Sequence, residues 1–489
     1  MQTDNVKPKT NERNKMSVNK LITELKTASC FYDAISWLAQ YESEWDDKVR
    51  TEYYGWIADE TSYDTKIQIE NAIEILSYSN QMNDEWAKDF FSYLSEILEE
   101  KNNAECICLF TLQLLDQKIH PSNIPNEDSV ICGYLNSDRS TSPILVYQAP
   151  PKSFQSEKIE KAKIRRNRNL GAWNPISQLN SIVNYMFIPR ENFGELAPTV
   201  FSYLPPTNVA IEDLRIAIAP ISKDAWFEVE WDDECKQFRC QYSQAEINQK
   251  VNEYLCAVVG NAAEKNAHIV VFPEMAANEN TVDHVRKYLL EHPKIKEKII
   301  LVVLGTNWRD GTNSGCILSG SGSEIISVKK RIPFSMFRKD SEGEDHEYYE
   351  YLLDTGGPLV MLDVERIGRF SWMICRDFLS DKIRNVSARM SCAFQIVSAY
   401  TDRLQEMLQR ARNDAAEYGM ITALSNHCIN NNGITERGFV YVPYVDEIAR
   451  CFIERTQSCC CKECVGKICF DKECYWICTI SKALDCVFE

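Results

Sequence analysis

The chain has 489 residues, of which 44% are apolar and 26% are charged, and this composition excludes a mostly disordered or fibrous protein. The length leaves room for several domains with buried cores and excludes a small disulfide-stapled module. A formal net charge of -17 disfavours general binding to polyanions such as nucleic acid.

The N-terminal residues contain no apolar stretch of the signal-peptide type, and no apolar run approaches the roughly 20 residues that a bilayer requires. We therefore expect a soluble, cytoplasmic protein that does not associate with membranes. In that compartment the 20 cysteines are expected to be reduced thiols rather than disulfides.

Residues 1–20 form a polar tail, and from residue 21 to 115 apolar residues recur at spacings of three and four, with few glycines or prolines. This periodicity predicts amphipathic helices. Prolines then punctuate residues 189–206, which indicates a connection into a new unit. We interpret residues 21–205 as a mainly helical interaction or assembly domain with a linker, through which a protein partner could bind.

A basic run, E-K-I-E-K-A-K-I-R-R-N-R, occupies residues 157–168. Such a run can contact a phosphate backbone or an acidic partner, or it can be the solvated face of a helix. The overall acidity of the chain favours the solvated face, so nucleic acid is a local alternative at this segment alone.

From residue 213 onward, short apolar runs alternate with helical patterns, which predicts an α/β domain. The clearest helical stripe covers residues 244–265, and two glycines at 320 and 322 predict a hairpin. The runs expected to be buried strands begin at Arg215, His268, Lys298, Phe370 and Phe394.

Three polar residues directly follow apolar runs: Glu274, Lys329 and Cys375. Active sites of α/β sheets collect at such strand ends. A cysteine attacks a carbonyl or nitrile carbon as a thiolate, and a carboxylate in an apolar pocket can accept its proton. A lysine would stabilise the resulting oxyanion. Together, these residue types predict a hydrolase with a Cys nucleophile, a Glu base and a Lys cation.

The same residues lie in segments that resemble the nitrilase superfamily of carbon–nitrogen hydrolases. The similar segments are V-F-P-E ending at Glu274, K-K-R-I-P beginning at Lys329, I-C-R-D around Cys375, and the downstream stretches at residues 410–426 and 438–449. The resemblance covers residues 213–489 and implies an α-β-β-α sandwich, a small amide or nitrile substrate, a homo-oligomer and no cofactor. It does not extend to residues 1–205.

The chain also departs from the pattern of the family. Arg376, between Cys375 and Asp377, stands where the family usually has an aromatic or acidic residue, and it could favour an anionic substrate or pair with a nearby carboxylate. Glu344 and Glu347 are both candidates for the second glutamate that orients the lysine. Lys330 competes with Lys329 for the lysine position, and the distance to Pro333 favours Lys329. Residues 223–242 look like an insertion.

Cysteines are concentrated in a tail at residues 451–486. Cys461 and Cys464 have the C-x-x-C spacing that can hold a structural zinc ion, although no second C-x-x-C follows. The alternative is that these are reduced cysteines that pack in terminal strands or lie in an exposed loop.

The leading functional hypothesis is hydrolysis of a non-peptide carbon–nitrogen bond through a cysteine thioester. Acyl transfer to an amine would use the same three residues. A hypothesis of another class is an interaction or regulatory subunit, because nitrilase-like domains resemble accessory modules of multi-protein bacterial systems, including those built around defence-associated reverse transcriptases.

Overall fold

The computed structural model describes the following residues: 16–28, 31–42, 47–78, 84–118, 130–132, 143–151, 184–221, 227–242, 245–339, 342–356, 359–431, 434–442, 452–455 and 475–480. The chain divides into two compact units. The first comprises residues 1–123, 134–149 and 172–192, and the second comprises residues 124–133, 150–171 and 193–489.

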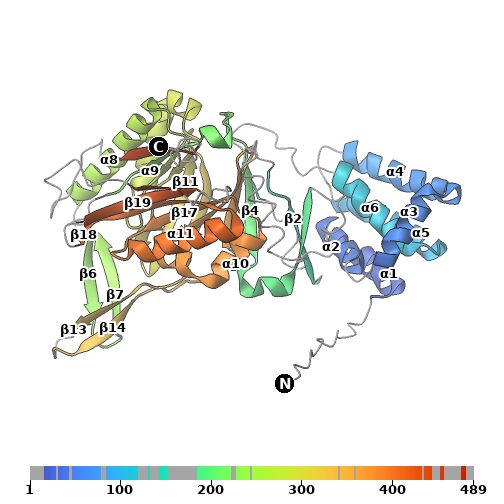
Figure 1. Cartoon of the computed structure of the whole chain (residues 1–489), viewed down its shortest axis with the longest axis horizontal. Coiled ribbons are helices and arrows are strands. Elements are labelled where there is room, and N and C mark those ends of the chain that lie inside the picture. The colour runs from blue at the N-terminus through green and yellow to red at the C-terminus, as the bar shows by residue number, and fades with distance from the viewer. Residues whose placement is uncertain are drawn as a thin grey trace, which may run out of the picture. The chain divides into compact units, whose positions relative to one another are not determined.

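The first unit is a helical assembly (Figure 1). Its helices are α1 (Val18–Thr27), α2 (Phe31–Glu42), α3 (Asp47–Ala58), α4 (Tyr63–Tyr78), α5 (Asp84–Glu100) and α6 (Ala104–Lys118), with the short η1 (Glu60–Ser62). Most of α6 is buried, because its neighbours α2, α3 and α4 pack around it. The predicted helical character of this region is confirmed.

A two-stranded hairpin, β2 (Ile144–Gln148) and β3 (Tyr185–Pro189), also belongs to the first unit and was not predicted. The carboxylate of Asp116 on α6 accepts the backbone N–H of Asn184 at 2.8 Å and that of Tyr185 at 3.1 Å. These bonds fix the start of β3 on the last turn of the helix.

The second unit contains two larger sheets. The first sheet has the order β1-β4-β15-β16-β17-β18-β19-β20, and the second has the order β10-β11-β9-β8-β5-β21, with β12 paired to β11. The strands of the first sheet are β1 (Val130–Cys132), β4 (Pro198–Tyr203), β15 (Leu359–Val364), β16 (Gly368–Ile374), β17 (Phe394–Ala399), β18 (Ile421–Asn431), β19 (Ile434–Val442) and β20 (Phe452–Arg455). Those of the second are β5 (Arg215–Ile218), β8 (Ile269–Val271), β9 (Leu301–Val303), β10 (Asn307–Arg309), β11 (Thr312–Ser319), β12 (Glu324–Lys329) and β21 (Trp476–Thr479).

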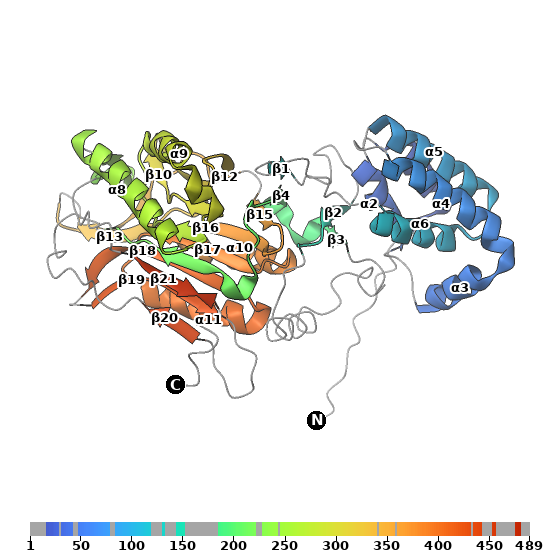
Figure 2. The same ribbon diagram turned by 90° about the horizontal axis from the view of Figure 1, so that it is seen from above.

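Helices cover the outer faces of these sheets (Figures 1 and 2). On the second sheet, α8 (Ala245–Glu264) and α9 (Thr281–Glu291) bury an apolar stripe against β5, β8, β9 and β11. On the first, α11 (Leu404–Tyr418) contacts β18 and β19, and α10 (Asp381–Arg389) lies beside it. The predicted α/β class, an α-β-β-α sandwich, is confirmed. The short 3-10 helices are η3 (Arg190–Asn192), η4 (Gly194–Leu196), η5 (Ile211–Asp213), η6 (Pro293–Glu297) and η7 (Cys375–Leu379).

The two sheets approach each other closely beneath the site described below. A Cβ atom on Gly315 of β11 would meet the ring of Trp372 on β16 at 2.6 Å, so only glycine allows this approach. Trp372 Nε1 donates to Ser398 Oγ at 3.1 Å, and Ser398 Oγ donates to the carbonyl of Phe272 at 2.8 Å. This buried chain of hydrogen bonds connects the first sheet to the end of β8 in the second.

The segment between Pro189 and Pro206 differs from the predicted linker. Residues 198–203 form β4, which pairs in parallel with β15 and buries Val200 and Tyr203. A proline is tolerated at the first position of a strand, and the residues after it are apolar or β-branched. The structure therefore assigns this segment to the sheet of the second unit rather than to the N-terminal domain.

A separate small sheet projects from the sandwich (Figure 1). It consists of β6 (Phe227–Asp232), β7 (Gln237–Tyr242), β13 (Ser335–Lys339) and β14 (Asp345–Glu350), with β14 parallel to β7. Strands β6 and β7 lie within residues 223–242, which the sequence indicated as an insertion.

No helix among the described residues is long and apolar enough to cross a membrane. The basic segment 157–168 and the candidate zinc ligands Cys461 and Cys464 lie outside the described residues. Within the cysteine-rich tail, Cys478 is buried on β21, which pairs with β5.

Candidate active site

Glu274 and Cys375 lie at the ends of strands in opposite sheets. Glu274 follows β8, and Cys375 follows β16. The ends of these two strands meet across the sandwich, so the thiol of Cys375 interacts directly with the carboxylate of Glu274. The structure therefore brings together two of the three residues that the sequence selected.

The backbone around Glu274 is fixed by a turn on β9. A Cβ atom on Gly305, which has φ +74°, would meet the carbonyl of Pro273 at 2.0 Å. Glycine is required at this position for both the positive φ and the close approach. The next residue, Thr306, accepts the backbone N–H of Met275 at 2.9 Å through its hydroxyl. Glu274 is thus held from both sides.

Cys375 occupies a sharp turn from strand to helix. Its φ of 47° lies in the left-handed region, which is unfavourable for residues other than glycine. The thiol is 3.8 Å from the carbonyl oxygen of Tyr400 and is 2% exposed. A backbone cost at a position that fixes the direction of a nucleophile is typical of catalytic turns.

The lysine beside Glu274 is Lys330 rather than Lys329. Lys329 is half-exposed and pairs with Asp354 at 2.6 Å, whereas Lys330 is buried. Adjacent residues of an extended chain point to opposite faces, and the buried Val328 is on the same face as Lys330. The alternation of buried and exposed residues along β12 predicts that Lys330 is the buried lysine. The spacing to Pro333 placed the lysine one residue too early, at Lys329.

Lys330 is bound between two carboxylates. Its Nζ lies 2.7 Å from Glu274 Oε1 and 2.5 Å from Glu350 Oε2. The amide of Asn313 on β11 donates to the same two carboxylates, at 2.8 Å and 3.0 Å. All four side chains are buried, so the cluster contains two carboxylates and one ammonium group shielded from water.

The second glutamate of this cluster is Glu350, and neither Glu344 nor Glu347 reaches Lys330. Glu344 is exposed, 4.0 Å from His346. Glu347 accepts a hydrogen bond from the Tyr349 hydroxyl at 2.6 Å. On β14 the fully buried Tyr348 shares its face with Glu350, and this alternation was the signal that sequence reasoning missed.

The burial of these groups shifts their pKa values. Burial raises the pKa of Glu274, and the charge of Glu350 raises it further, while Lys330 opposes both. Burial also raises the pKa of Cys375, as does the negative charge of Glu274. Burial acts to lower the pKa of Lys330, but the two carboxylates outweigh it and hold that pKa well above its usual range. The resting site therefore contains a neutral thiol beside a carboxylate of increased basicity and a permanent ammonium group.

Asp377 connects the nucleophile turn to the loop after Lys330. Its carboxylate accepts the backbone N–H groups of Arg331 at 3.1 Å and Ile332 at 2.8 Å. Burial raises the pKa of Asp377 to about 7, although these two bonds oppose the shift. We assign Asp377 a positioning role, because its contacts are to the backbone.

A cavity of about 420 Å³ reaches Cys375. Part of its wall comes from β13 and β14, through Ser335, Phe337 and Glu347. The opposite part comes from the segment after β17 and from α11, through Thr401, Arg403 and Met407. Arg376 also lines this cavity, next to the thiol. Its volume is within the range of small-molecule sites.

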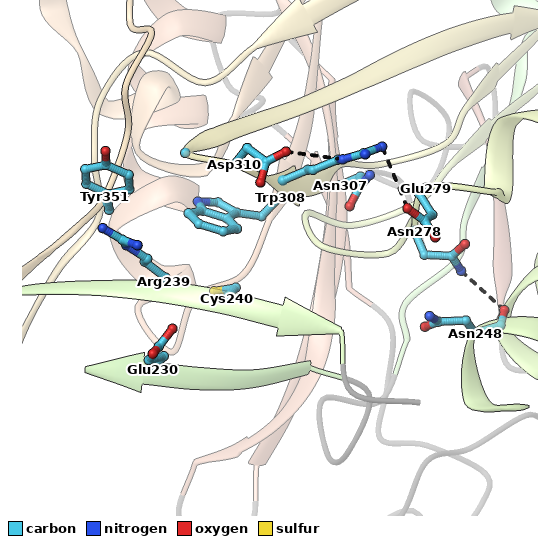
Figure 3. A pocket seen from close by; sticks show the side chains of 12 residues that line it. Glu230, Arg239, Cys240, Asn248, Asn278, Glu279, Asn307, Trp308, Asp310 and Tyr351 are labelled. Atoms are coloured by element: carbon cyan, nitrogen blue, oxygen red, sulfur yellow. Dashed lines mark hydrogen bonds and ion pairs between the residues drawn. The ribbon is translucent and has the colours of Figure 1, made fainter. Parts of the chain in front are cut away.

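A second cavity of about 390 Å³ lies beneath the β6–β7 hairpin (Figure 3). Its lining includes the polar side chains of Asn248, Asn278 and Arg239. Its cysteine, Cys240, has a pKa raised by burial and by the charges of Glu350 and Glu274. Both thiols have raised pKa values, so protonation does not distinguish them. The first cavity is the candidate site because Glu274 lies within hydrogen-bonding range of Cys375, whereas it acts on Cys240 through its charge.

No group of His, Cys, Asp and Glu side chains that could hold a metal ion occurs among the described residues. The described site contains a thiol, two carboxylates and an ammonium group.

No protein-family model matches the chain, and no curated protein matches it. Among solved structures it is similar to the glutamine-dependent NAD+ synthetase of Acinetobacter baumannii, with 13% identity, a TM-score of 0.36, and coverage of 54% of this chain and 45% of the synthetase. It is also similar to an amidase of the nitrilase superfamily from Nesterenkonia AN1, with 14% identity, a TM-score of 0.34, and coverage of 50% and 88%. The NitFhit protein of C. elegans has 16% identity, a TM-score of 0.35, and coverage of 55% and 61%.

The chain thus spans less than half the length of the synthetase. Members of the nitrilase superfamily are found among its structural neighbours, as the sequence resemblance implied.

Proposed function

We propose that the second unit is a thiol-dependent hydrolase of a non-peptide carbon–nitrogen bond, of the amidase or nitrilase type. The single observation that supports this most strongly is the buried contact of Cys375 with Glu274, a carboxylate that also accepts hydrogen bonds from Lys330 and Asn313. A purely structural core would not require a carboxylate beside this thiol, because a buried thiol packs there as a small apolar group.

In the proposed reaction, Glu274 takes the thiol proton as Cys375 Sγ attacks the carbonyl carbon of an amide. The developing oxyanion is stabilised by Lys330 and by backbone N–H groups that follow the nucleophile. Glu274 then gives the proton to the leaving nitrogen, and ammonia or an amine departs as the carbon–nitrogen bond breaks. A thioester on Cys375 remains.

Water completes the cycle. Glu274 accepts a proton from the water molecule as its oxygen attacks the thioester carbon. The carbon–sulfur bond breaks, the thiol is restored with the proton that Glu274 held, and a carboxylic acid leaves. If an amine replaced water in this step, the same residues would carry out acyl transfer.

Glu350 and Asn313 have supporting roles in this proposal. Glu350 balances the charge of Lys330 and fixes its Nζ, since the distance between them is 2.5 Å. The side-chain amide of Asn313 donates to both carboxylates, so it bridges them and fixes the orientation of Glu274.

Intact-protein mass spectrometry after mixing with a panel of small amides tests this function. We expect a mass increase equal to the acyl group, located on Cys375 by peptide mapping, and no increase in Cys375→Ala. Glu274→Gln should slow both the formation and the loss of the adduct. If folded wild-type protein forms no adduct and no product across the panel, the alternative of an interaction or regulatory module is favoured.

A further inference from the structure

The cavity at Cys375 contains charged side chains of both signs, and their partners differ. Four charged residues line it: Glu347, Arg376, Arg403 and Glu406. Arg403 and Glu406 lie 3.8 Å apart at the exposed rim, where they balance each other. The other two charged residues of the cavity, Arg376 and Glu347, are not part of that ion pair.

Arg376 is fixed next to the nucleophile. It is the residue after Cys375, and its Nη1 donates to Ser335 Oγ at 2.7 Å and to the carbonyl of Pro333 at 3.4 Å. These two contacts, to the last residues before β13 and to its first residue, fix Nη1 of the guanidinium group. The remaining N–H groups of an arginine form a planar fork suited to a carboxylate.

No described carboxylate forms an ion pair with Arg376. The charge of Arg376 acts on Glu347 of β14, and this carboxylate has other donors. The Tyr349 hydroxyl and Ser335 bond to it and lower its pKa, and the charge of Arg376 contributes less. The guanidinium group thus keeps donor capacity and positive charge toward the cavity. Of the two interpretations that the sequence left open for Arg376, the geometry favours contact with an anionic ligand.

We propose that Arg376 is a specificity-determining residue that binds a carboxylate of the substrate, so that the hydrolase acts on small amides that also carry a carboxylate group. The substrate class in this inference rests on the proposed hydrolase function, whereas the binding of an anion by Arg376 does not. The same side chain should attract any small anion toward the thiol of Cys375, whether or not turnover occurs.

Competitive alkylation of the full-length protein tests this without requiring hydrolysis. Iodoacetate and iodoacetamide both place a two-carbon group on the thiol, and they differ in charge. Peptide mapping gives the rate constant of each reagent at Cys375, and their ratio cancels the low intrinsic reactivity of a buried, protonated thiol. We expect Arg376→Gln to lower the ratio of iodoacetate to iodoacetamide by roughly tenfold or more.

Two further variants serve as controls. Arg376→Lys keeps the charge and should retain most of the preference for iodoacetate. Arg412→Gln removes an exposed arginine of α11 that does not line the cavity, and it should leave the ratio unchanged. An unchanged ratio in Arg376→Gln, or no reaction of iodoacetate with wild-type Cys375 while iodoacetamide reacts, would overturn the proposal.

A matched substrate pair then joins the inference to catalysis. Succinamate and its methyl ester present the same amide and differ by one charge. We expect a lower KM for succinamate in the wild type, with the difference lost in Arg376→Gln while kcat changes little. If the amide of the methyl ester were hydrolysed and that of succinamate were not, the carboxylate site would be contradicted and the proposed hydrolase function would be retained. A charge-dependent alkylation ratio without turnover of any amide would support the site and contradict the proposed reaction.

Discussion

A buried ionic group lies near each end of strand β16, and the two groups differ in the ratio of positive to negative charges. At its start, Arg369 donates to both oxygens of Asp363 at 2.7 Å and 2.8 Å and to the carbonyl of Met390 at 2.9 Å. One guanidinium group faces one carboxylate, and each satisfies the other. At its end, beside Cys375, one ammonium group faces two carboxylates.

This difference in charge balance distinguishes a pair with a structural role from a cluster that we expect to transfer protons. In a balanced, bidentate pair, the attraction between the two charges offsets the cost of burying them, and both groups stay charged. Burial raises the pKa of Asp363 as well as that of Glu274, but only at Glu274 does the charge of a second carboxylate, Glu350, raise the pKa further. The two buried ionic groups therefore differ in stoichiometry, and we expect only the unbalanced cluster to take part in proton transfer.

The largest expected effect comes from removing the cation of the unbalanced cluster. In Lys330→Met, two buried carboxylates lose their ammonium group and the oxyanion loses its donor. We expect kcat/KM to fall by roughly a factor of 1000 and thermal stability to decrease as well. Steady-state kinetics and calorimetry on the purified variant measure the two losses.

Lys329→Met is the matched control for that variant. Lys329 is the adjacent residue with the same side chain, but it pairs with Asp354 at the surface. Surface pairs contribute at most about 1 kcal/mol, so both rate and stability should remain close to wild type. A severe catalytic defect in Lys329→Met with a mild one in Lys330→Met would contradict the position of the lysine described above.

Breaking the balanced pair should affect stability alone. Asp363→Asn leaves the guanidinium group of Arg369 buried without its counter-charge, and we expect a loss of about 3–5 kcal/mol in the stability of the second unit. The kcat of the molecules that remain folded should not change. Replacing both partners, in Arg369→Met with Asp363→Leu, should recover most of the stability, because no buried charge is left.

A smaller effect is expected from the hydrogen bonds that join the two sheets. Ser398→Ala removes the link between Trp372 and the carbonyl of Phe272, two residues before Glu274. The lost bonds leave a buried N–H and a buried carbonyl unsatisfied, at a cost of about 1–3 kcal/mol. Denaturant titration measures this loss, and a change in kcat larger than in KM would indicate that the strand ends also moved.

Much of this fold could be predicted from the sequence, because buried strands appear as apolar runs. The strands that begin near Arg215, His268, Phe370 and Phe394, and the hairpin of β11 and β12, were all predicted. Strand β4 was missed because prolines on both sides of it indicated a linker. Its assignment depends on parallel pairing with β15, about 160 residues later in the chain, which no local pattern reveals.

The sequence predicted only those residues of the candidate site whose positions depend on where a strand ends. Glu274 and Cys375 each follow a strand, and the ends of those strands are fixed by the topology of the sandwich. Lys330 and Glu350 depend instead on which face of a strand a residue occupies. A shift of one residue reverses the face, so an alignment that is correct in every other respect selects the wrong lysine.

The least disruptive test of the comparison changes one charge of the unbalanced cluster. In Glu350→Gln the cluster becomes one ammonium group and one carboxylate, as at the other end of β16. Glu350 contributes to raising the pKa of Glu274, so its neutralisation should lower that pKa. The base must be unprotonated to work, and activity is therefore lost as the pH falls through the pKa of Glu274.

The wild-type acidic limb of kcat/KM should consequently lie above the usual pKa range of a glutamate, and the limb of Glu350→Gln should move to lower pH. Asn313 and Lys330 still bond to Glu274 in this variant, so the protein should remain folded and the activity at neutral pH should fall only modestly. A pH–rate profile between pH 4 and 9 measures the shift. A limb that stays in place, or that moves to higher pH, would mean that Glu274 does not titrate in the rate-determining step and that the excess charge of this cluster has another purpose.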